Sequence, residues 1–295
     1  MNIDTLRLFC DVVQHQSFSR GAALHGVSQS AATQSIHRME KDLHVVLFDR
    51  SVRPPQVTPE GELCAAGFRE LIRRYDEILT QVQMLGDSMS GQIRVAAIYS
   101  VGLHVMSRCM SDFLKTYPKA KVRLEFLHPQ KVYQAVHDAE VDLGILSYPM
   151  ATREIEVIPL RSETMVLACP TSHPLANKKS ITFRDLSEVD FVGFDQDLPI
   201  RKEIDQHFRK LNIAVNLLME FDNIETIKQA VETGLGVSIL PAPTIRTENE
   251  AGLIKMIPIT SPIITRPIGI IHKSKKLFSP IAKKFIEQLT SLQTD

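Results

Sequence analysis

Long apolar segments are absent from this 295-residue chain, and with them the usual signals for membranes and secretion. No run of eighteen consecutive apolar residues occurs, so the sequence predicts no membrane-spanning helix. Near the N-terminus, Asn2, Asp4 and Arg7 lie within a helical pattern, where a signal peptide would have a charged stub and an apolar stretch. We therefore expect no membrane contact, no secretion and a cytoplasmic location.

Cysteine is scarce, and its spacing argues against two kinds of structural cross-link. The four cysteines are widely separated and form no Cys-x-x-Cys or Cys/His pair: Cys10, Cys64, Cys109 and Cys169. We therefore expect neither a zinc site nor a disulfide framework, and a reducing compartment fits best. A redox-sensing thiol would need a stabilised thiolate, whereas buried, inert cysteine is the commoner case.

The familiar motifs of enzymes are also missing. There is no Gly-x-Ser-x-Gly, no Walker loop, no Gly-x-Gly-x-x-Gly and no pair of histidines at metal-ligand spacing. The run at residues 234–236, Gly-Leu-Gly, lacks the third glycine and enters a predicted strand instead of a helix. We expect no enzyme, no catalytic residues, no metal and no cofactor.

An excess of charge is missing as well. The 34 basic and 34 acidic side chains cancel, which argues against a protein that holds nucleic acid through a large positive field. A selective DNA reader with few phosphate contacts is still compatible with this balance. The length and the 44% hydrophobic content favour a globular protein with more than one domain.

What the chain does have is a helix-turn-helix pattern at residues 17–38. Ala22, Ala23 and Leu24 give a first short helix a small apolar face, and Gly26 can adopt the left-handed conformation that ends it. We expect Val27 to tuck into the core before a second helix begins. This layout makes DNA the first partner to consider.

The second helix of this pattern has one apolar and one polar face. Its apolar stripe recurs at helical spacing in Ala32, Ile36, Met39 and Leu43. Amide, hydroxyl and guanidinium groups pair with base edges and phosphates in the major groove, and the opposite face is rich in them. The predicted DNA-binding residues of this helix are Ser28, which also caps it, Gln29, Ser30, Thr33, Gln34, His37 and Arg38. The alternative is an ordinary three-helix packing with no nucleic acid.

Segments on both sides extend the pattern. Residues 5–15 predict a supporting first helix, capped by Asn2 or Asp4. Two short strands at residues 45–48 and 56–58 flank a basic, proline-stiffened loop, which is typical of a wing. We expect Arg50 at its base and Arg53 at its tip to meet the minor groove or phosphates. The alternative is a plain surface hairpin.

A long helix is predicted to follow the wing. Pro59 suits its first turn with Thr58 as its cap, and Gly86 can help to end it. Apolar residues alternate at spacings of four and three along it, which forms a heptad seam: Cys64, Phe68, Leu71, Tyr75, Ile78, Val82 and Leu85. The seam indicates pairing with a second copy or packing on another domain, and dimerisation is the simpler interpretation.

Beyond residue 90 the pattern predicts a mixed α/β structure. Strands are expected at residues 93–99, 121–127, 141–147, 163–168, 191–194, 215–221, 236–240 and 267–272. Helices are expected between them at residues 101–116, 131–139, 200–211 and 224–233. Ligands in such sheets settle outside the carboxyl ends of the strands, near helix N-termini.

With these residues in view, the chain resembles the LysR-type transcriptional regulators over nearly its whole length. In the N-terminal part the resemblance is carried by Leu6, Phe9, residues 17–19, Ala22, Ala23, residues 27–31, Ile36, Glu40, Leu43, Leu47, Phe48, Arg50 and residues 58–61. Further support comes from residues 113–118, 141–145, 173–175 and 234–241.

The resemblance implies an N-terminal all-α winged helix-turn-helix domain followed by an α/β effector domain with a type 2 periplasmic-binding-protein-like fold. It implies a DNA-binding domain at residues 1–58, a dimerisation helix at 59–90 and an effector domain at 91–295. Two crossover strands would join two Rossmann-like subdomains, the first at about 91–161 and 267–295 and the second at about 162–266. The effector would bind between them.

The family likeness also implies partners. These are a palindromic site in double-stranded DNA, a second copy of the chain through the long helix, a homotetramer built as a dimer of dimers, a small-molecule effector and, for an activator, RNA polymerase. The chain departs from the family at His44, where glycine usually ends the recognition helix, and we expect that helix end to be more strained or built differently. Ser30 replaces a frequent proline and Thr33 a frequent serine, which puts the base preference in doubt.

By matching position, the effector contacts fall at the ends of predicted strands and the starts of helices: Ser100, Val101, Gly102, His128, Pro129, Ser147, Tyr148, Phe194, Arg201 and Thr226. Ser100 is the strongest candidate, because its hydroxyl and the following N–H groups suit a carboxylate. Each residue has an alternative role as a helix cap or in packing. Arg201 favours an anionic effector, but Asp195 and Glu225 would cancel its charge.

Two other functions stay open at this point. One is a solute receptor or α/β enzyme with an accessory N-terminal domain. The other is a regulator that needs no small molecule.

Overall fold

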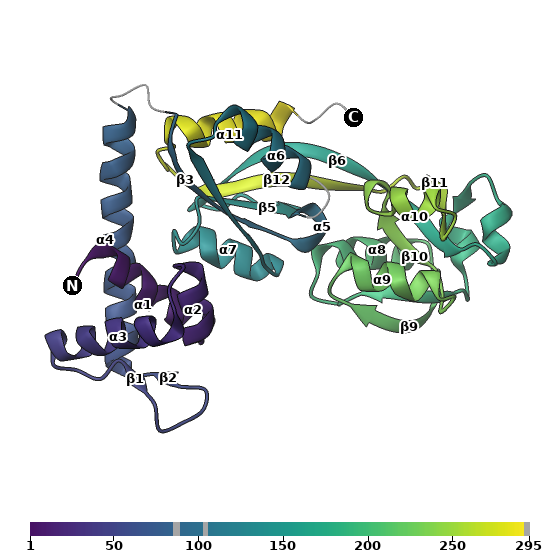
Figure 1. Ribbon diagram of the computed structural model, residues 1–295. Helices are drawn as coiled ribbons and strands as arrows, with labels where there is room; N and C mark the ends of the chain where they lie inside the picture. The colour runs from purple at the N-terminus through teal and green to yellow at the C-terminus, as the bar shows by residue number, and fades with distance from the viewer. Residues whose placement is uncertain (85–88, 103–105, 292–295) are drawn as a thin grey trace. The chain divides into compact units, whose positions relative to one another are not determined.

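The computed structural model of the protein describes residues 1–84, 89–102 and 106–291 (Figure 1). The chain divides into two compact units, Met1–Asp87 and Ser88–Asp295, and each is described by itself. Among the described residues, no helix combines the length and the apolar character needed to cross a bilayer.

The first unit is a helix-turn-helix with a short hairpin and a long helix. Its elements are α1 (Ile3–His15), α2 (Phe18–Leu24), α3 (Gln29–Leu43), β1 (Phe48–Asp49), β2 (Gln56–Val57) and α4 (Pro59–Met84). Asn2, Ser17 and Ser28 begin α1, α2 and α3 as side-chain caps, each accepting a bond from a backbone N–H. The core of this unit is built around Phe9, whose ring packs edge-on against Phe48 and Phe68.

The prediction that Val27 tucks into the core is wrong, because its side chain is 42% exposed. The contact between α1 and α2 is made instead by smaller residues earlier in α2. Gly21 and Ala22 are the buried residues of α2, and a Cβ added to Gly21 would lie 2.4 Å from Val12 Cγ2. The valine backbone still shapes the turn, since its N–H donates to the Ala22 carbonyl.

The end of α3 is built with a left-handed residue that is not glycine. His44 has φ 56°, and its N–H and that of Val45 donate to the carbonyls of Lys41 and Glu40. The expected departure at this position is therefore confirmed as a strained helix end, in which histidine adopts the conformation that glycine adopts most easily.

The long helix α4 has two apolar faces instead of one. Ala65, Phe68 and Ile72 are buried in the core of the first unit, so Phe68 belongs to that core and not to an open seam. The other seam residues that the structure describes beyond it, Leu71, Tyr75, Ile78 and Val82, are exposed. The predicted seam residue Leu85 and helix end Gly86 lie outside the described residues.

The second unit contains one mixed sheet shared by two lobes. Its strands are β3 (Gly91–Ala97), β4 (Ala120–Phe126), β5 (Leu143–Ser147), β6 (Ile155–Pro170), β7 (Ile181–Thr182), β8 (Asp190–Phe194), β9 (Asn216–Phe221), β10 (Ser238–Pro241), β11 (Ile254–Ser261) and β12 (Thr265–Lys273). The order is β4-β3-β5-β12-β6-β11-β7, β10 also pairs with β6, and β8 and β9 form a separate parallel pair.

The helices of this unit cover the sheet in the two lobes. They are α5 (Tyr99–Val101), α6 (Ser107–Thr116), α7 (Pro129–His137), α8 (Pro199–Lys210), α9 (Ile224–Glu232), α10 (Arg246–Glu250) and α11 (Pro280–Ser291), with short 3₁₀ helices at Pro174–Asn177, Phe183–Leu186 and Ala242–Ile245. One core is formed around β3, β5, α7 and α11, which we call the first lobe. The second lobe has its own core around β8, β10, α8 and α9.

Two long strands connect the lobes. Residues 155–164 of β6 pair with β12, and residues 165–170 pair with β10 and β11. Figure 1 shows β6 and β12 running between the two lobes. The strand predicted at residues 163–168 is therefore only part of β6. The first half of β6 alternates between buried and exposed residues, so no continuous apolar run marked it in the sequence.

Other predicted elements also differ from the structure. The helix expected at residues 101–116 is two helices, α5 and α6, and residues 103–105 between them lie outside the described residues. The elements β7, β11, α10 and α11 are not among those predicted from the sequence. The strands β7 and β11 pair with each other in parallel, a long-range contact that no local pattern predicts.

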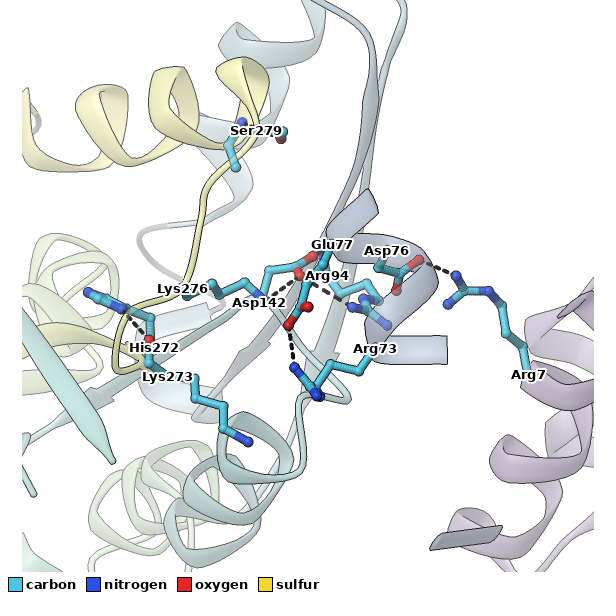
Figure 2. A network of polar contacts seen from close by, with 11 residues as sticks. Arg7, Arg73, Asp76, Glu77, Arg94, Asp142, His272, Lys273, Lys276 and Ser279 are labelled. Atoms are coloured by element: carbon cyan, nitrogen blue, oxygen red, sulfur yellow. Dashed lines mark hydrogen bonds and ion pairs between the residues drawn. The ribbon is translucent and has the colours of Figure 1, made fainter. Parts of the chain in front are cut away.

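A half-buried carboxylate ties the first lobe together. Asp142 accepts bonds from the Arg94 backbone N–H at 2.7 Å and from Lys276 Nζ at 2.8 Å (Figure 2). Burial alone would raise the pKa of Asp142, but the positive charges of Arg94 and Lys276 hold it well below its usual range. In the first unit, an ion pair between Arg7 and Asp76 joins α1 to α4 in the same way (Figure 2).

Candidate functional site

The polar face of α3 is open to solvent. Ala32, Ile36 and Met39 are buried on its opposite side, as predicted. Six of the predicted DNA-binding residues on this helix and its cap are exposed and one, Thr33, is half-buried: Ser28, Gln29, Ser30, Gln34, His37 and Arg38 are the exposed ones. The helix therefore presents one contiguous set of amide, hydroxyl and basic side chains.

Short contacts orient the first turn of α3. Ser28 Oγ accepts a bond from the Ala31 N–H at 3.2 Å and lies 2.9 Å from Ser30 Oγ. Ser19 of α2 donates its hydroxyl to Gln29 Oε1 at 3.0 Å, so the amide of Gln29 is held from the preceding helix. Thr33 donates its hydroxyl to the Gln29 carbonyl, which is a role within the helix.

A buried glutamate, which was not among the predicted site residues, links α3 to the hairpin. Glu40 Oε1 accepts the N–H groups of Leu47 at 3.0 Å and Phe48 at 3.3 Å, while Oε2 accepts from Arg50 at 2.9 Å. His37 Nδ1 lies 3.3 Å from the same oxygen. Two predicted DNA-binding residues, His37 and Arg50, therefore converge on one carboxylate.

The hairpin is short, and the loop at residues 50–54 between its strands is exposed. Arg53 lies in its open loop, whereas Arg50 lies beside a surface pocket of about 470 Å³. The pocket is lined by His37, Glu40, Val46, Phe48, Asp49, Arg50 and Thr58. The position of Glu40 on the buried side of α3, four residues after Ile36, is the sequence signal that would have identified it.

In the second unit, Ser100 lies against a buried arginine that sequence reasoning missed. Arg266 of β12 is 1% exposed and donates from Nη1 to Ser100 Oγ at 3.0 Å. Its Nε and Nη2 donate to Glu163 Oε2 at 3.0 and 2.5 Å. Arg161, on the same strand as Glu163, donates to the other carboxylate oxygen, with its Nε at 3.0 Å. The signal available in the sequence was a charged residue, Arg266, within an otherwise apolar stretch.

Tyr148 lies beside this group. It follows β5 with a left-handed φ of 52°, and its N–H donates to the carbonyl of Pro267, the residue after Arg266. Its hydroxyl is buried and has no hydrogen-bond partner among the residues that the structure describes. Burial, together with the negative charge of Glu203, raises the pKa of Tyr148 to about 12, so the hydroxyl stays protonated at neutral pH. Ser147, the preceding residue, is buried in the strand.

Val101 and Gly102 serve packing and backbone contacts. Val101 is buried, and both residues donate their N–H groups to the Ile98 carbonyl. A Cβ added to Gly102 would lie 1.9 Å from the ring of Phe126, which stacks on Tyr99 with centroids 5.4 Å apart. Glycine is therefore required here by the close approach of an aromatic ring.

His128 and Pro129 begin α7, with Pro129 in the first turn. The imidazole Nε2 of His128 lies 3.4 Å from Asp197 Oδ2, on the segment before α8. This contact connects the first lobe to the second. On the second lobe, burial raises the pKa of Asp195, and the nearby charges of Asp222 and Asp197 add to the effect.

The cation Arg201 is engaged within the second lobe. It is buried, and its guanidinium donates to the Phe194 carbonyl at 2.5 Å and to Asp205 at 2.8 Å, and it also pairs with Glu220. Phe194 is buried as well. Thr226 donates its N–H and hydroxyl to Asn223 Oδ1 at 2.9 and 3.0 Å, which makes it part of the cap of α9.

The structure thus brings Ser100 to Arg266, and it places Ser147 and Tyr148 beside the next residues of β12, Ile268 and Pro267. Arg201 with Phe194, and Thr226 with the α9 cap, belong to separate groups in the second lobe. Across the part of the chain that the structure describes, no three side chains of the types that bind metals come together.

Comparison with known families matches both units. The model described as "Bacterial regulatory helix-turn-helix protein, lysR family" matches residues 3–62, and that described as "LysR substrate binding domain" matches residues 86–293. An uncharacterised HTH-type transcriptional regulator of Escherichia coli (strain K12), YbhD, is 30% identical over 293 residues, covering 99% of this chain and 92% of that protein.

Solved structures are similar as well. Full-length OxyR from Pseudomonas aeruginosa, as a single-residue variant, superposes with a TM-score of 0.70 at 24% identity, covering 99% of this chain and 94% of that one. The regulatory domain of Synechocystis CcmR in complex with 2-PG superposes with a TM-score of 0.64 at 24% identity, covering 70% and 99%.

Proposed function

The chain belongs to the LysR family of transcriptional regulators, and we propose that it binds a palindromic promoter site as a dimer of dimers and changes transcription when a small molecule binds its C-terminal unit. The family consists of regulators, not enzymes, with a DNA-binding helix-turn-helix and an effector-binding domain. The observation that carries the proposal is the exposed polar face of α3, led by Gln29, Gln34 and Arg38.

The DNA contact follows from the chemistry of that face. Gln pairs with adenine and Arg with guanine through two hydrogen bonds each in the major groove. Arg53 in the hairpin loop is free of the Glu40 contact that engages Arg50, so we assign Arg53 to the minor groove or phosphates and Arg50 to holding the hairpin.

Two exposed apolar surfaces support the proposed assembly. On α4, Leu71, Tyr75, Ile78 and Val82 offer a surface to the same helix of a second copy. On β9, which pairs only with β8 among the described strands, Leu217, Leu218 and Met219 are exposed and offer a second surface. Two different surfaces are what a dimer of dimers needs.

Effector binding is assigned to the group around Ser100, Tyr148 and Arg266, at the strands that connect the lobes. The likeness to the CcmR regulatory domain, which was solved with 2-PG, supports a small-molecule site in this unit. For an activator, we propose RNA polymerase as a further partner. An effector bound between the lobes would change the arrangement of the dimers on DNA.

The test of DNA recognition is a band-shift titration of a palindromic operator with single variants. Gln29→Ala and Arg38→Ala are each expected to weaken specific binding about tenfold to a hundredfold, because each loses a contact of about 1–3 kcal/mol. Gln206→Ala removes an exposed amide from α8 and is the matched control, with unchanged binding expected. Wild-type affinity in both test variants would overturn the assignment of α3.

The test of dimerisation is light scattering of a variant with one added charge. Ile78→Glu is expected to convert the assembly to smaller species, since an acidic side chain would be buried against its own copy. Ala66→Glu places the same charge on an exposed position of α4 away from the apolar face and is expected to leave the mass unchanged. An unchanged mass in Ile78→Glu would contradict dimerisation through this face.

A further inference from the structure

Two glutamines on the exposed face of α3 differ in how their amides are held. Ser19 of α2 donates its hydroxyl to Gln29 Oε1 at 3.0 Å, so a neighbouring helix holds the Gln29 amide. Further along α3, the amide of Gln34 makes no hydrogen bond to any residue that the structure describes. Both glutamine side chains are exposed. Folding therefore arranges one amide of this face in advance and leaves the other free to turn.

The turn between the helices brings Ser19 and Gln29 together. Ser19 lies in the first turn of α2, and Gln29 is the first residue of α3. Between them, Gly26 adopts a left-handed φ of 64°, a conformation that glycine adopts at little cost. The nearby hydroxyl of Ser17 accepts a backbone N–H as the cap of α2, so it serves that helix itself. The Ser19 hydroxyl is instead directed across the turn to the amide of Gln29.

The contact leaves the Gln29 amide with a defined set of free groups. An amide oxygen accepts two hydrogen bonds and an amide nitrogen donates two. Ser19 uses one acceptor position of Oε1, which leaves one acceptor beside the two donors of Nε2. In the major groove, adenine offers a donor beside an acceptor, whereas guanine offers two acceptors. The held amide matches adenine. Guanine needs an amide turned to present its donors alone, and the bond from Ser19 opposes that rotation.

We propose that Ser19 is a positioning residue that sets the base preference of Gln29, in favour of adenine over guanine at the base pair that Gln29 reads. This inference rests on the proposed recognition of DNA by α3 and adds a residue of α2 that determines specificity. An amide held before binding loses less side-chain freedom when it meets the base. Discrimination is therefore sharper at the base pair read by Gln29 than at that read by Gln34, whose amide is free to turn.

The experiment selects binding sites from a randomised double-stranded DNA library with the full-length protein and its variants. Gln29→Ala is expected to lose the base preference at one position of each half-site, which identifies the base pair that Gln29 reads. Ser19→Ala is expected to lower the adenine-to-guanine ratio at that position about threefold to tenfold, the effect of one hydrogen bond, and to leave the other positions unchanged.

Two further variants separate the hydroxyl of Ser19 from general effects of substitution. Ser19→Thr keeps the hydroxyl and is expected to keep the wild-type ratio. Ser111→Ala removes an exposed hydroxyl from α6 in the second unit and is the matched control, with every position expected to select as in wild type.

A double-mutant cycle separates positioning from a direct contact of Ser19 with DNA. Band-shift titrations with the selected duplex compare Ser19→Ala, Gln29→Ala and the double variant. If Ser19 acts through Gln29, adding Ser19→Ala to Gln29→Ala is expected to cause no further loss of affinity. A direct bond from Ser19 to a phosphate would weaken binding by the same factor with or without Gln29, and that result would overturn the inference.

Three selection results also overturn the inference: a wild-type ratio in Ser19→Ala, an equal loss of preference at every position, or a ratio in Ser19→Thr as low as that in Ser19→Ala. The wild-type selection separates such a failure from failure of the proposed function. A wild-type protein that enriches no sequence would refute the proposed function and the inference together. An enriched palindrome whose Gln29 position is unaffected by Ser19→Ala would refute the inference alone.

Discussion

The two units of this protein place their polar chemistry in opposite environments. On α3, the side chains proposed to read DNA are exposed and lie on one face of one helix. In the second unit, Arg266 and Glu163 are buried and lie 103 residues apart in the sequence, on different strands. The first arrangement is a local surface that folding leaves open. The second exists only after distant strands have paired, so its polar groups contribute to the fold as well as to the proposed binding.

The largest expected effect on stability comes from removing the carboxylate of Glu163, which Arg161 and Arg266 share. Glu163→Gln leaves the guanidinium groups of Arg161 and Arg266 unpaired, and it is expected to destabilise the second unit by about 3–5 kcal/mol. The exposed Gln34→Ala is expected to change stability by less than about 0.5 kcal/mol. Urea unfolding of both variants measures the difference. Similar stabilities would show that the buried pair is not structural.

Glu40 tests whether the first unit has a buried polar group of the same kind. Glu40→Gln loses charge from a side chain that holds Leu47, Phe48 and Arg50, and the expected loss of stability is about 2–3 kcal/mol. Operator affinity should fall as well, because the hairpin is no longer fixed to α3. Gln56→Ala, an exposed residue of β2, is the control for the hairpin. Unchanged stability in Glu40→Gln would mean that the buried polar contacts of Glu40 do not stabilise the first unit.

The pH dependence of Asp142 sharpens the contrast further. The folded-state pKa of Asp142 is lowered, so in acid the unfolded state binds more protons than the folded state. Its contribution is fully present above the unfolded pKa of about 3.9 and is lost as pH falls from there through the folded pKa. Asp142→Asn is expected to cost about 2 kcal/mol at neutral pH and to flatten the acid limb of the stability curve. If the loss of stability at low pH is the same in this variant as in wild type, carboxylates other than Asp142 cause it.

The smallest expected effect is at His44, where relief of backbone strain is opposed by the entropy of the unfolded chain. His44→Gly removes the left-handed strain of about 1–2 kcal/mol but adds about 0.5–1 kcal/mol of backbone entropy to the unfolded chain. The net result is a gain of about 0.5–1 kcal/mol in the unfolding free energy, read from thermal melts. His44→Ala, which keeps the strain, is expected to gain nothing. Equal stability of both variants would mean that the helix end is not strained.

Sequence reasoning predicted the elements of the first unit and the polar face of α3 because helical periodicity is a local property. It erred at Val27, which was predicted to lie in the core and is exposed, because local spacing alone does not decide between core and solvent. In the second unit it selected Ser100 and Tyr148 as candidates through their positions at the ends of strands. It missed Arg266 and Glu163, and it placed an anion-binding role on Arg201, whose partner Glu220 comes from β9, 19 residues away.

By itself, the sequence determined the helix-turn-helix, the presence of a long amphipathic helix and the alternation of strands and helices that follows, since each is encoded in the spacing of neighbouring residues. Only the tertiary structure decided which charges cancel. Charge balance in a buried place depends on which strands lie side by side, and β6 and β12 bring together two cations, Arg161 and Arg266, that share the carboxylate of Glu163. That pairing is a property of the folded sheet, and no local pattern contains it.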